Sequence, residues 1–109
     1  MTMSGLEFHV LLALADDALH GWAIAERVTV DSEGALHPRA GTLYRVIARL
    51  MAEGWVVEKR AGADTPPHPG LPRRYYGLTA AGRTALADES ARLRQAAAVA
   101  LKRLGVSRS

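Results

Sequence analysis

The chain has 109 residues, a formal charge of +3 and no cysteine, and its sequence pI is about 9.8. This length favours one domain, and the lack of cysteine excludes a disulfide framework, a thiolate nucleophile and a zinc ribbon. No apolar run approaches the roughly 20 residues that span a bilayer, and the N-terminus lacks a signal-peptide pattern, so we expect a soluble cytoplasmic protein.

Basic residues are concentrated in the middle of the chain. Positions 39–83 hold eight of the 14 lysines and arginines but only three of the 11 acidic residues, which gives a local charge of +5. The remaining six basic and eight acidic residues sum to −2. A basic region of this kind favours an anionic partner such as nucleic acid.

Two amphipathic helices are predicted near the N-terminus. The first covers residues 3–15, and Ser4 and Glu7 have the spacing of a capping box. Phe8 and Leu12 widen its apolar stripe, which predicts contact with a second surface. The second helix runs from about residue 19 or 20 to residue 30, and a turn-rich segment follows it. Its candidate core residues are Trp22, Ile24, Ala25 and Val28.

The segment 38–54 predicts a short helix with two chemically different faces. Pro38 suits a first helical turn, and Gly54 suits the position just past a helix end. At about 100° per residue, Thr42, Arg45 and Arg49 share one side with no acidic residue among them. That side favours an anion, and an ordinary solvated surface is the alternative interpretation. The opposite side is a predicted buried stripe of Leu43, Val46, Ile47 and Leu50.

After residue 54 the hydrophobic period changes from about 3.6 to about 2, which predicts a hairpin with strands at 55–60 and 73–78. The segment between them, 61–72, holds four of the five prolines and therefore predicts an extended loop rather than a strand. Tyr75 and Tyr76 point to opposite faces of their strand, so we expect one in the core and the other partly exposed.

A long final helix is predicted from its cap at Thr79 to about Leu104, with Gly105 as its terminator. Some 25 residues make a rod of about 37 Å, which is longer than a domain of this size can cover. A narrow seam of five residues predicts a homodimer; the alternative is a helix that folds back onto its own domain. The seam consists of Leu86, Leu93, Ala97, Ala100 and Leu104.

The element order is helix, helix, helix, two-stranded hairpin, helix, so the predicted fold class is mainly α with a small β-hairpin (α+β). This order is typical of a winged helix-turn-helix, in which the third helix enters the major groove and the hairpin reaches the adjacent phosphates or minor groove. We expect a DNA-binding domain at 1–79 with its wing at about 55–78. A dimerisation helix at 80–105 and a frayed tail at 106–109 complete the prediction.

The sequence also resembles the PadR-like transcriptional regulators over residues 6–104. The second helix has His20-Gly21-Trp22-Ala23-Ile24, similar to the His-Gly-Tyr signature of that family but with Trp22 where Tyr is usual. The other matching positions are Gly41-Thr42-Leu43-Tyr44-Arg45, Leu50, Gly54, Arg73-Arg74-Tyr75-Tyr76, Leu78-Thr79, Gly82-Arg83, Leu86 and Glu89. The resemblance implies a winged-helix dimer that usually represses transcription, in the short form with a single C-terminal helix.

The resemblance also implies site residues. It matches Thr42, Tyr44 and Arg45 to the recognition helix and Arg73 and Arg74 to the basic pair of the wing. Arg45 is the best candidate for a bidentate contact with guanine. Tyr44 lies on the flank of the helix, so we expect its ring in the core, and its hydroxyl either reaches a phosphate or makes no DNA contact. Arg83 is either a phosphate contact or a surface charge. The full set of predicted DNA contacts is Arg39, Thr42, Tyr44, Arg45, Arg49, Lys59, Arg73 and Arg74.

Many relatives respond to small molecules in the dimer cleft. Because the final helix has no aromatic residue, Phe8 and Leu12 of the first helix are the candidate lining for such an effector pocket.

Other classes of function are less well supported by the residues. The four histidines lack ligand spacing and no Gly-rich phosphate loop follows a strand, so we expect neither an enzyme nor a metal or cofactor. His20, just before a helix, is more typical of a cap or packing residue than of a base. The remaining alternative is a winged helix that binds protein without DNA specificity, which would show weak salt dependence.

Overall fold

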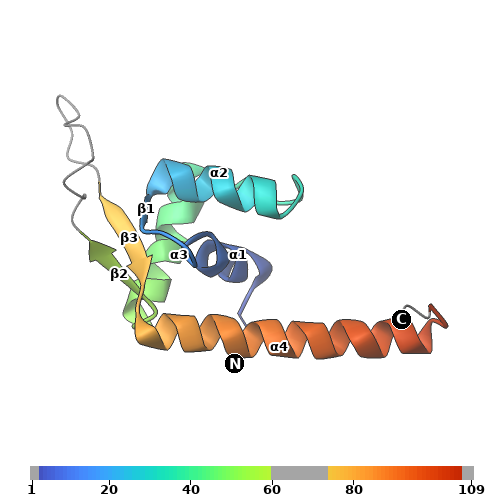
Figure 1. The fold of residues 1–109 in the computed structure, drawn as a ribbon. Coiled ribbons are helices and arrows are strands. Elements are labelled where there is room, and N and C mark those ends of the chain that lie inside the picture. The colour runs from blue at the N-terminus through green and yellow to red at the C-terminus, as the bar shows by residue number, and fades with distance from the viewer. Residues whose placement is uncertain (1–2, 60–73, 107–109) are drawn as a thin grey trace.

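The computed structural model describes residues 3–59 and 74–106. The element order is α1 (Gly5–Ala13), β1 (Leu19–His20), α2 (Gly21–Asp31), α3 (Ala40–Ala52), β2 (Val56–Lys59), β3 (Tyr75–Leu78) and α4 (Ala80–Arg103). Figure 1 shows the first three helices and the sheet gathered at one end of α4, which continues beyond them as a rod. The predicted class, mainly helical with a small β-structure, is confirmed. The predicted loop 61–72 lies outside the described residues.

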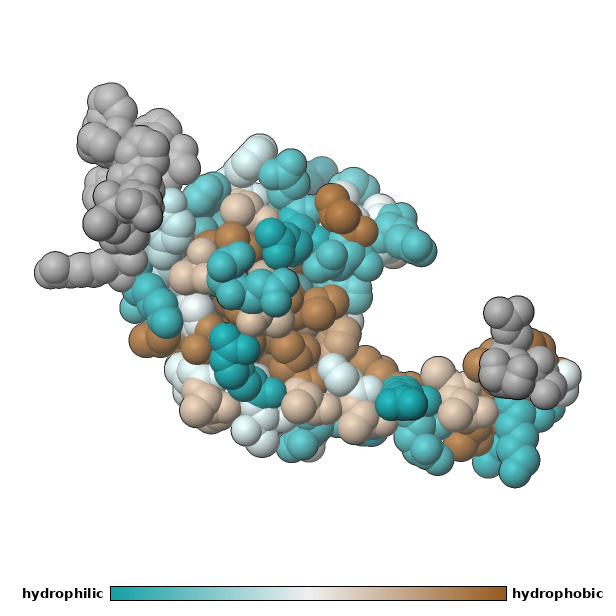
Figure 2. Space-filling view, viewed as in Figure 1, coloured by the Kyte–Doolittle hydropathy of each residue, from teal (hydrophilic) through white to brown (hydrophobic). Residues whose placement is uncertain are grey.

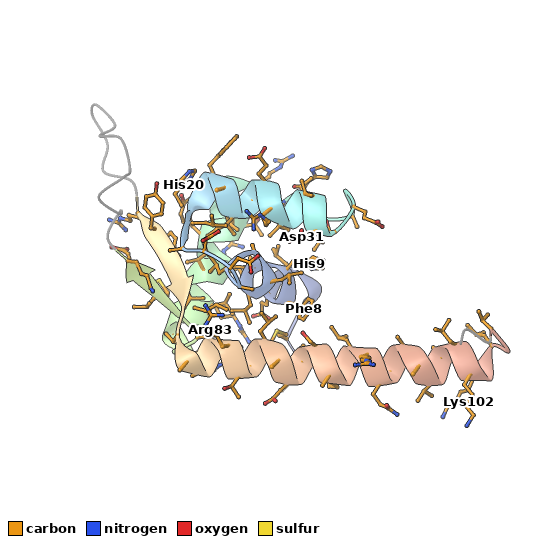
Figure 3. The ribbon with its side chains drawn as sticks, viewed as in Figure 1. Phe8, His9, His20, Asp31, Arg83 and Lys102 are labelled. Atoms are coloured by element: carbon orange, nitrogen blue, oxygen red, sulfur yellow. The ribbon has the colours of Figure 1, made fainter. Side chains whose placement is uncertain are left out.

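The predicted capping box begins α1. The Ser4 backbone N–H donates to Glu7 Oε1 at 2.6 Å, and the Glu7 backbone N–H donates to Ser4 Oγ at 3.1 Å. The helix ends at Ala13, two residues earlier than predicted, and a side chain of α4 contacts the turn that follows. Arg83 Nη1 donates to the Ala15 carbonyl at 3.0 Å, so this arginine joins the start of α4 to the end of α1 (Figure 3).

The position of Trp22 contradicts the prediction that it belongs to the core. Ile24 and Val28, one turn apart, form the fully buried side of α2, whereas Trp22 is 70% exposed. Two residues before Ile24, Trp22 is turned by about 200° around the helix and so points away from the core. Its indole stacks on the His20 ring instead, with the ring centroids 6.2 Å apart.

The sheet has three antiparallel strands in the order β1-β3-β2, one more than predicted. The predicted hairpin pairs β2 with β3, from Val56 opposite Leu78 to Lys59 opposite Tyr75. The additional strand β1 has two residues, which is too short to produce a hydrophobic period in the sequence. Its pairing with β3 explains why α2 begins only at Gly21.

The core lies between the three short helices and the sheet. Side chains of α1, α2, α3, β2 and β3 all contribute to it, and Tyr76 is buried while Tyr75 is half-buried, as predicted. Pro38 does not lie in the first turn of α3, because Arg39 is the N-cap and the helix begins at Ala40. The other end matches the prediction: Gly54 has φ +81°, a conformation that strains any residue with a Cβ.

A close joint fixes the start of α4. Thr79 Oγ1 donates to the Gly54 carbonyl at 2.6 Å and accepts from the Gly82 N–H at 2.9 Å, which confirms the predicted cap. Gly82 lies directly on the Trp55 carbonyl oxygen, which a Cβ at this position would overlap. At the far end Gly105 has φ +73° and terminates the helix as predicted. The joint therefore links α4 to the segment that follows α3.

Among the described residues, α4 packs on α1 and β3, and Figure 1 shows these elements beside its first half. Residues 90–98 are exposed throughout, and the molecule is 56 Å long but only 27 and 25 Å in its other dimensions. The alternative that α4 folds back along its whole length is therefore wrong. Within the described ranges, none of the helices combines the length and the apolar character that a membrane span requires.

Candidate nucleic-acid interface

The two faces of α3 are separated as predicted, except that Val46 of the predicted buried stripe is only half-buried. Leu43, Ile47 and Leu50 are at most 2% exposed, whereas Thr42 and Arg45 lie on the exposed side. Within the part of the chain that the structure describes, no hydrogen bond or ion pair holds the Arg45 side chain. The Arg45 guanidinium therefore projects from the centre of the outward face with its donors available for an acceptor.

Arg49 differs from Arg45, because an acidic residue of another helix pairs with it. Arg49 Nε lies 2.6 Å from Glu7 Oε2, in an ion pair that joins α3 to α1. Glu7 is only 8% exposed, so the pair sits at the edge of the core. The sequence could not reveal it, because the two residues are 42 positions apart and belong to different helices.

Tyr44 lies on the flank of α3 between the core and the outward face. It is 47% exposed, and its ring meets that of Tyr76 edge-on with the centroids 6.5 Å apart. The Tyr44 hydroxyl packs against Gly21, where a Cβ would overlap it. The tyrosine thus connects α3 to both β3 and the start of α2.

Two basic side chains lie at one end of the hairpin, on the last residue of β2 and just before β3. Lys59 lies opposite Tyr75, and its aliphatic stem crosses the face of Gly77. Arg74 directly precedes β3 and is exposed. Burial raises the pKa of the Tyr76 hydroxyl, as do Tyr44 and Glu58, whereas the nearby Arg74 opposes that shift. The Tyr76–Tyr44 contact therefore brings this basic end of the hairpin beside α3.

Seven of the eight predicted DNA contacts belong to the described residues. Arg39 is exposed as the N-cap of α3 and makes no side-chain cap bond. Arg73, together with Arg60, lies outside the described residues.

A family model matches most of the chain. Residues 10–88 match the model described as the transcriptional regulator PadR-like family. The chain belongs to this family. It is also 31% identical over 94 residues to the transcriptional regulator Rv3488 of Mycobacterium tuberculosis, covering 86% of this chain and 80% of that one.

Solved structures of PadR-like proteins share the fold. A PadR family regulator of Clostridium difficile superposes with a TM-score of 0.75 at 20% identity, covering 93% of this chain and 99% of the other. Bacillus subtilis PadR, solved in complex with operator DNA, superposes with a TM-score of 0.65 at 21% identity. That match covers 78% of this chain and 47% of the longer protein.

The family's His-Gly signature has a structural role in this chain. His20 is the N-cap of α2, and its Nδ1 accepts from the Ala23 N–H at 3.3 Å, which confirms the prediction of a cap. Gly21 leaves room for the Tyr44 ring. Membership of a family of transcriptional regulators confirms that the chain is not an enzyme. Among residues 3–59 and 74–106, no three potential metal ligands are grouped.

The predicted dimerisation seam divides into two parts. Leu86 packs against the core of its own domain, because the first turns of α4 lie on α1. Leu93 and Leu104 are 39% and 74% exposed, and Ala97 and Ala100 are exposed as well. Figure 2 shows hydrophobic surface both over α1 and on the free end of α4. The seam without Leu86 is called the distal seam below.

The predicted effector residues Phe8 and Leu12 are half-buried on α1. Phe8 packs on the neighbouring His9 ring, with the centroids 5.6 Å apart, and both project from the part of α1 above the middle of α4 (Figure 3). Neither Phe8 nor Leu12 lines a hollow of about 390 Å³ between the start of α1 and the first half of α4. Its lining residues are Met3, Trp55, Ala81, Thr84, Ala85, Asp88, Glu89 and Arg92.

The charged pair in this hollow is structurally satisfied. Glu89 accepts from Arg92 Nε at 2.9 Å and from Arg92 Nη2 at 2.6 Å. These hydrogen bonds lower the pKa of Glu89 and raise that of Arg92. The sequence analysis assigned none of these lining residues to a pocket, because the hollow forms between α1, Trp55 and α4, which are distant in the sequence.

Proposed function

We propose that this chain is a sequence-specific regulator of transcription that binds double-stranded DNA in the cytoplasm and represses its target genes. The observation that carries the proposal is the Arg45 guanidinium, exposed and unpaired among the described residues at the centre of the outward face of α3. The major groove admits one helix, and a guanidinium on that helix can pair with the O6 and N7 atoms of guanine. Thr42 extends the same face, and Arg39 precedes it.

The hairpin supplies the second part of the proposed interface. Lys59 and Arg74 are exposed beside α3, where they would meet the phosphates on one side of the groove. Arg73 stays in the proposal on the strength of its sequence position alone. Phosphate contacts position the protein without reading sequence, so the helix and the hairpin would have different roles in recognition.

We propose that the active form is a homodimer joined through the distal seam. Leu93, Leu104 and the alanines between them leave apolar surface in water, and a second copy of α4 provides a surface of the same kind. A two-fold axis would present two α3 helices to half-sites of an inverted repeat, about one helical turn apart.

A small-molecule effector completes the proposal. The partner copy would close the space beside Phe8 and Leu12, whose half-buried side chains would form the apolar wall of the site. Titration of the dimer with a panel of planar aromatic compounds, followed by tryptophan fluorescence and by DNA affinity, tests this part. No binding and unchanged DNA affinity across the panel would remove it.

The experiment that tests the main proposal is the enrichment of binding sequences from a random duplex pool at about 0.15 M salt, where counterion release already penalises purely electrostatic binding. We expect an inverted repeat. Recovery of no preferred sequence, together with weak salt dependence, would favour a winged helix that binds protein instead.

A further inference from the structure

The ion pair between Glu7 and Arg49 connects the first helix to the helix that carries Arg45. Arg49 Nε lies 2.6 Å from Glu7 Oε2, and the other carboxylate oxygen accepts from the Ser4 N–H at 2.6 Å. The Glu7 side chain is 11% exposed, whereas that of Arg49 is 56% exposed. Both oxygens of a nearly buried carboxylate are therefore occupied, one by the helix cap and the other by the arginine.

This environment determines where the Arg49 guanidinium can go. A buried carboxylate requires a partner, and removing one member of such a pair leaves an uncompensated charge in a poorly solvated place. The pair neutralises the charge of Arg49 and fixes its Nε beside α1, so Arg49 can turn its whole guanidinium towards a phosphate only by leaving Glu7 in that condition. Arg45 has no such constraint, because no described residue pairs with it.

We propose that Glu7 is a specificity-setting residue of the DNA interface, acting through Arg49. It neutralises the charge of Arg49, holds its guanidinium at the α1 side of α3 and anchors α3 to the capped end of α1, so that Arg45 is the arginine of α3 that reads DNA. This inference rests on the proposed function. It revises the sequence-based prediction that Arg45 and Arg49 contact DNA together.

The test is Glu7→Gln, which keeps an oxygen for the Ser4 N–H but removes the charge that holds Arg49. Dissociation constants are measured for the enriched operator and for a random duplex between about 0.05 and 0.2 M salt. A released Arg49 adds one phosphate contact per protomer, so the salt slope steepens by about 1.8 for a dimer. Affinity for random DNA then falls about tenfold more than in the wild type across this range, and discrimination between operator and random DNA decreases.

Arg49→Gln and the double variant Glu7→Gln/Arg49→Gln complete the set. We expect both to keep the wild-type salt slope, whereas Arg74→Gln lowers it. A slope lowered by Arg49→Gln as much as by Arg74→Gln would overturn the proposal, as would a Glu7→Gln protein with unchanged slope and discrimination. If a single variant does not fold, the double variant, which leaves no unpaired charge, still tests the proposal. A wild-type salt slope supports it, and a lowered slope means that Arg49 contacts phosphate in the wild type.

A matched control exists on α4. Glu89 and Arg92 also lie 2.6 Å apart, with side chains 9% and 51% exposed, but away from α3. Glu89→Gln should therefore leave the discrimination between operator and random DNA unchanged in protein whose dimeric state is verified by sedimentation.

Failure of the proposed function can be separated from failure of the Glu7–Arg49 ion pair to hold α3, which is called the tether here. A wild-type protein that binds neither duplex refutes DNA binding, and the tether is then measured on the protein alone by a double-mutant cycle of urea unfolding. A coupling between Glu7 and Arg49 clearly above experimental error supports the tether. Additive effects of the two substitutions would overturn it.

Discussion

The outward face of α3 and the distal seam of α4 are both uncovered, but their chemistry differs. On α3, Thr42 and Arg45 are hydrophilic groups that water solvates well. On α4, Leu93 and Leu104 are 39% and 74% exposed, and such surface gains free energy when it leaves water. The outward face of α3 is therefore stable in water without a partner and suits reversible binding of an anion, whereas the distal seam of α4 favours a permanent apolar partner.

The same difference predicts opposite responses to salt. Contacts of a cationic face with DNA weaken as salt rises, because counterions are no longer released into a dilute solution. Association through an apolar seam has no such dependence. DNA binding through α3 and dimerisation through α4 can therefore be distinguished by their dependence on salt as well as by their place in the fold.

The largest expected effect comes from the joint that holds the two faces in a fixed relation. In Gly82→Ala the new Cβ would overlap the Trp55 carbonyl oxygen, which cannot rotate away as a side chain would. We expect a loss of about 3 kcal/mol in the free energy of unfolding, measured in urea. Gly5→Ala is the control, since nothing lies within 4 Å of a Cβ there; its stability should stay within about 0.5 kcal/mol of the wild type. Equal stabilities for the two variants would contradict the importance of the joint.

The distal seam is tested next by Leu93→Glu. Loss of two buried leucine side chains, one from each copy, should weaken the dimer by at least about 3 kcal/mol, or about a hundredfold in Kd. Analytical ultracentrifugation measures the effect, and circular dichroism should report intact helices. Gln95→Glu introduces the same charge on the opposite side of α4, about 180° from the seam, and should leave the dimer unchanged. Dissociation by both variants alike would speak against the seam.

Arg45→Ala tests the cationic face. We expect a loss of about 1–3 kcal/mol of discrimination at one base position in each half-site, with random DNA bound almost as before. Competition between operator variants measures it. Equal losses on operator and random DNA would mean that Arg45 contacts only phosphate.

Arg74→Ala tests whether the hairpin contacts phosphates, in contrast to the base contact expected of Arg45. Because Arg74 is expected to contact phosphate, its loss should weaken all sequences alike and lower the salt slope by about one per protomer. Binding titrations at several salt concentrations give the slope. A loss confined to one base position would assign base contact to the hairpin.

Trp22→Ala should have the smallest effect. Trp22 is 70% exposed, so we expect the free energy of unfolding to change by no more than about 0.5 kcal/mol. Leu50→Ala, at a fully buried position, should cost about 2–5 kcal/mol in the same assay. A large effect of Trp22→Ala on dimerisation would show that exposed apolar residues outside the distal seam also have partners.

Local features were predictable because they depend on neighbours in sequence. The Ser4–Glu7 capping box, the Thr79 cap and the glycines at 54 and 105 all occur where their local patterns indicated. Each arises from backbone hydrogen bonds or φ angles within a few residues of itself. The two faces of α3 follow from the helical period in the same way.

Features that join distant segments were missed or misjudged. β1 is two residues long and exists because β3 pairs with it. Trp22 is exposed because Ile24 and Val28 occupy the buried side of α2. Leu86 packs against the core of its own domain rather than extending the distal seam. None of these positions has a local pattern that reveals its neighbour.

By itself, the sequence determined the order of the helices and the hairpin, their caps and the polarity of each face, because these depend on periodicity and on local hydrogen bonds. Only the tertiary structure decided which charges are available. Glu7 and Arg49 are 42 residues apart in the chain and yet form an ion pair, whereas Arg45, one turn from Arg49, has no partner among the described residues. Electrostatic pairing depends on distance in space, and folding alone sets that distance.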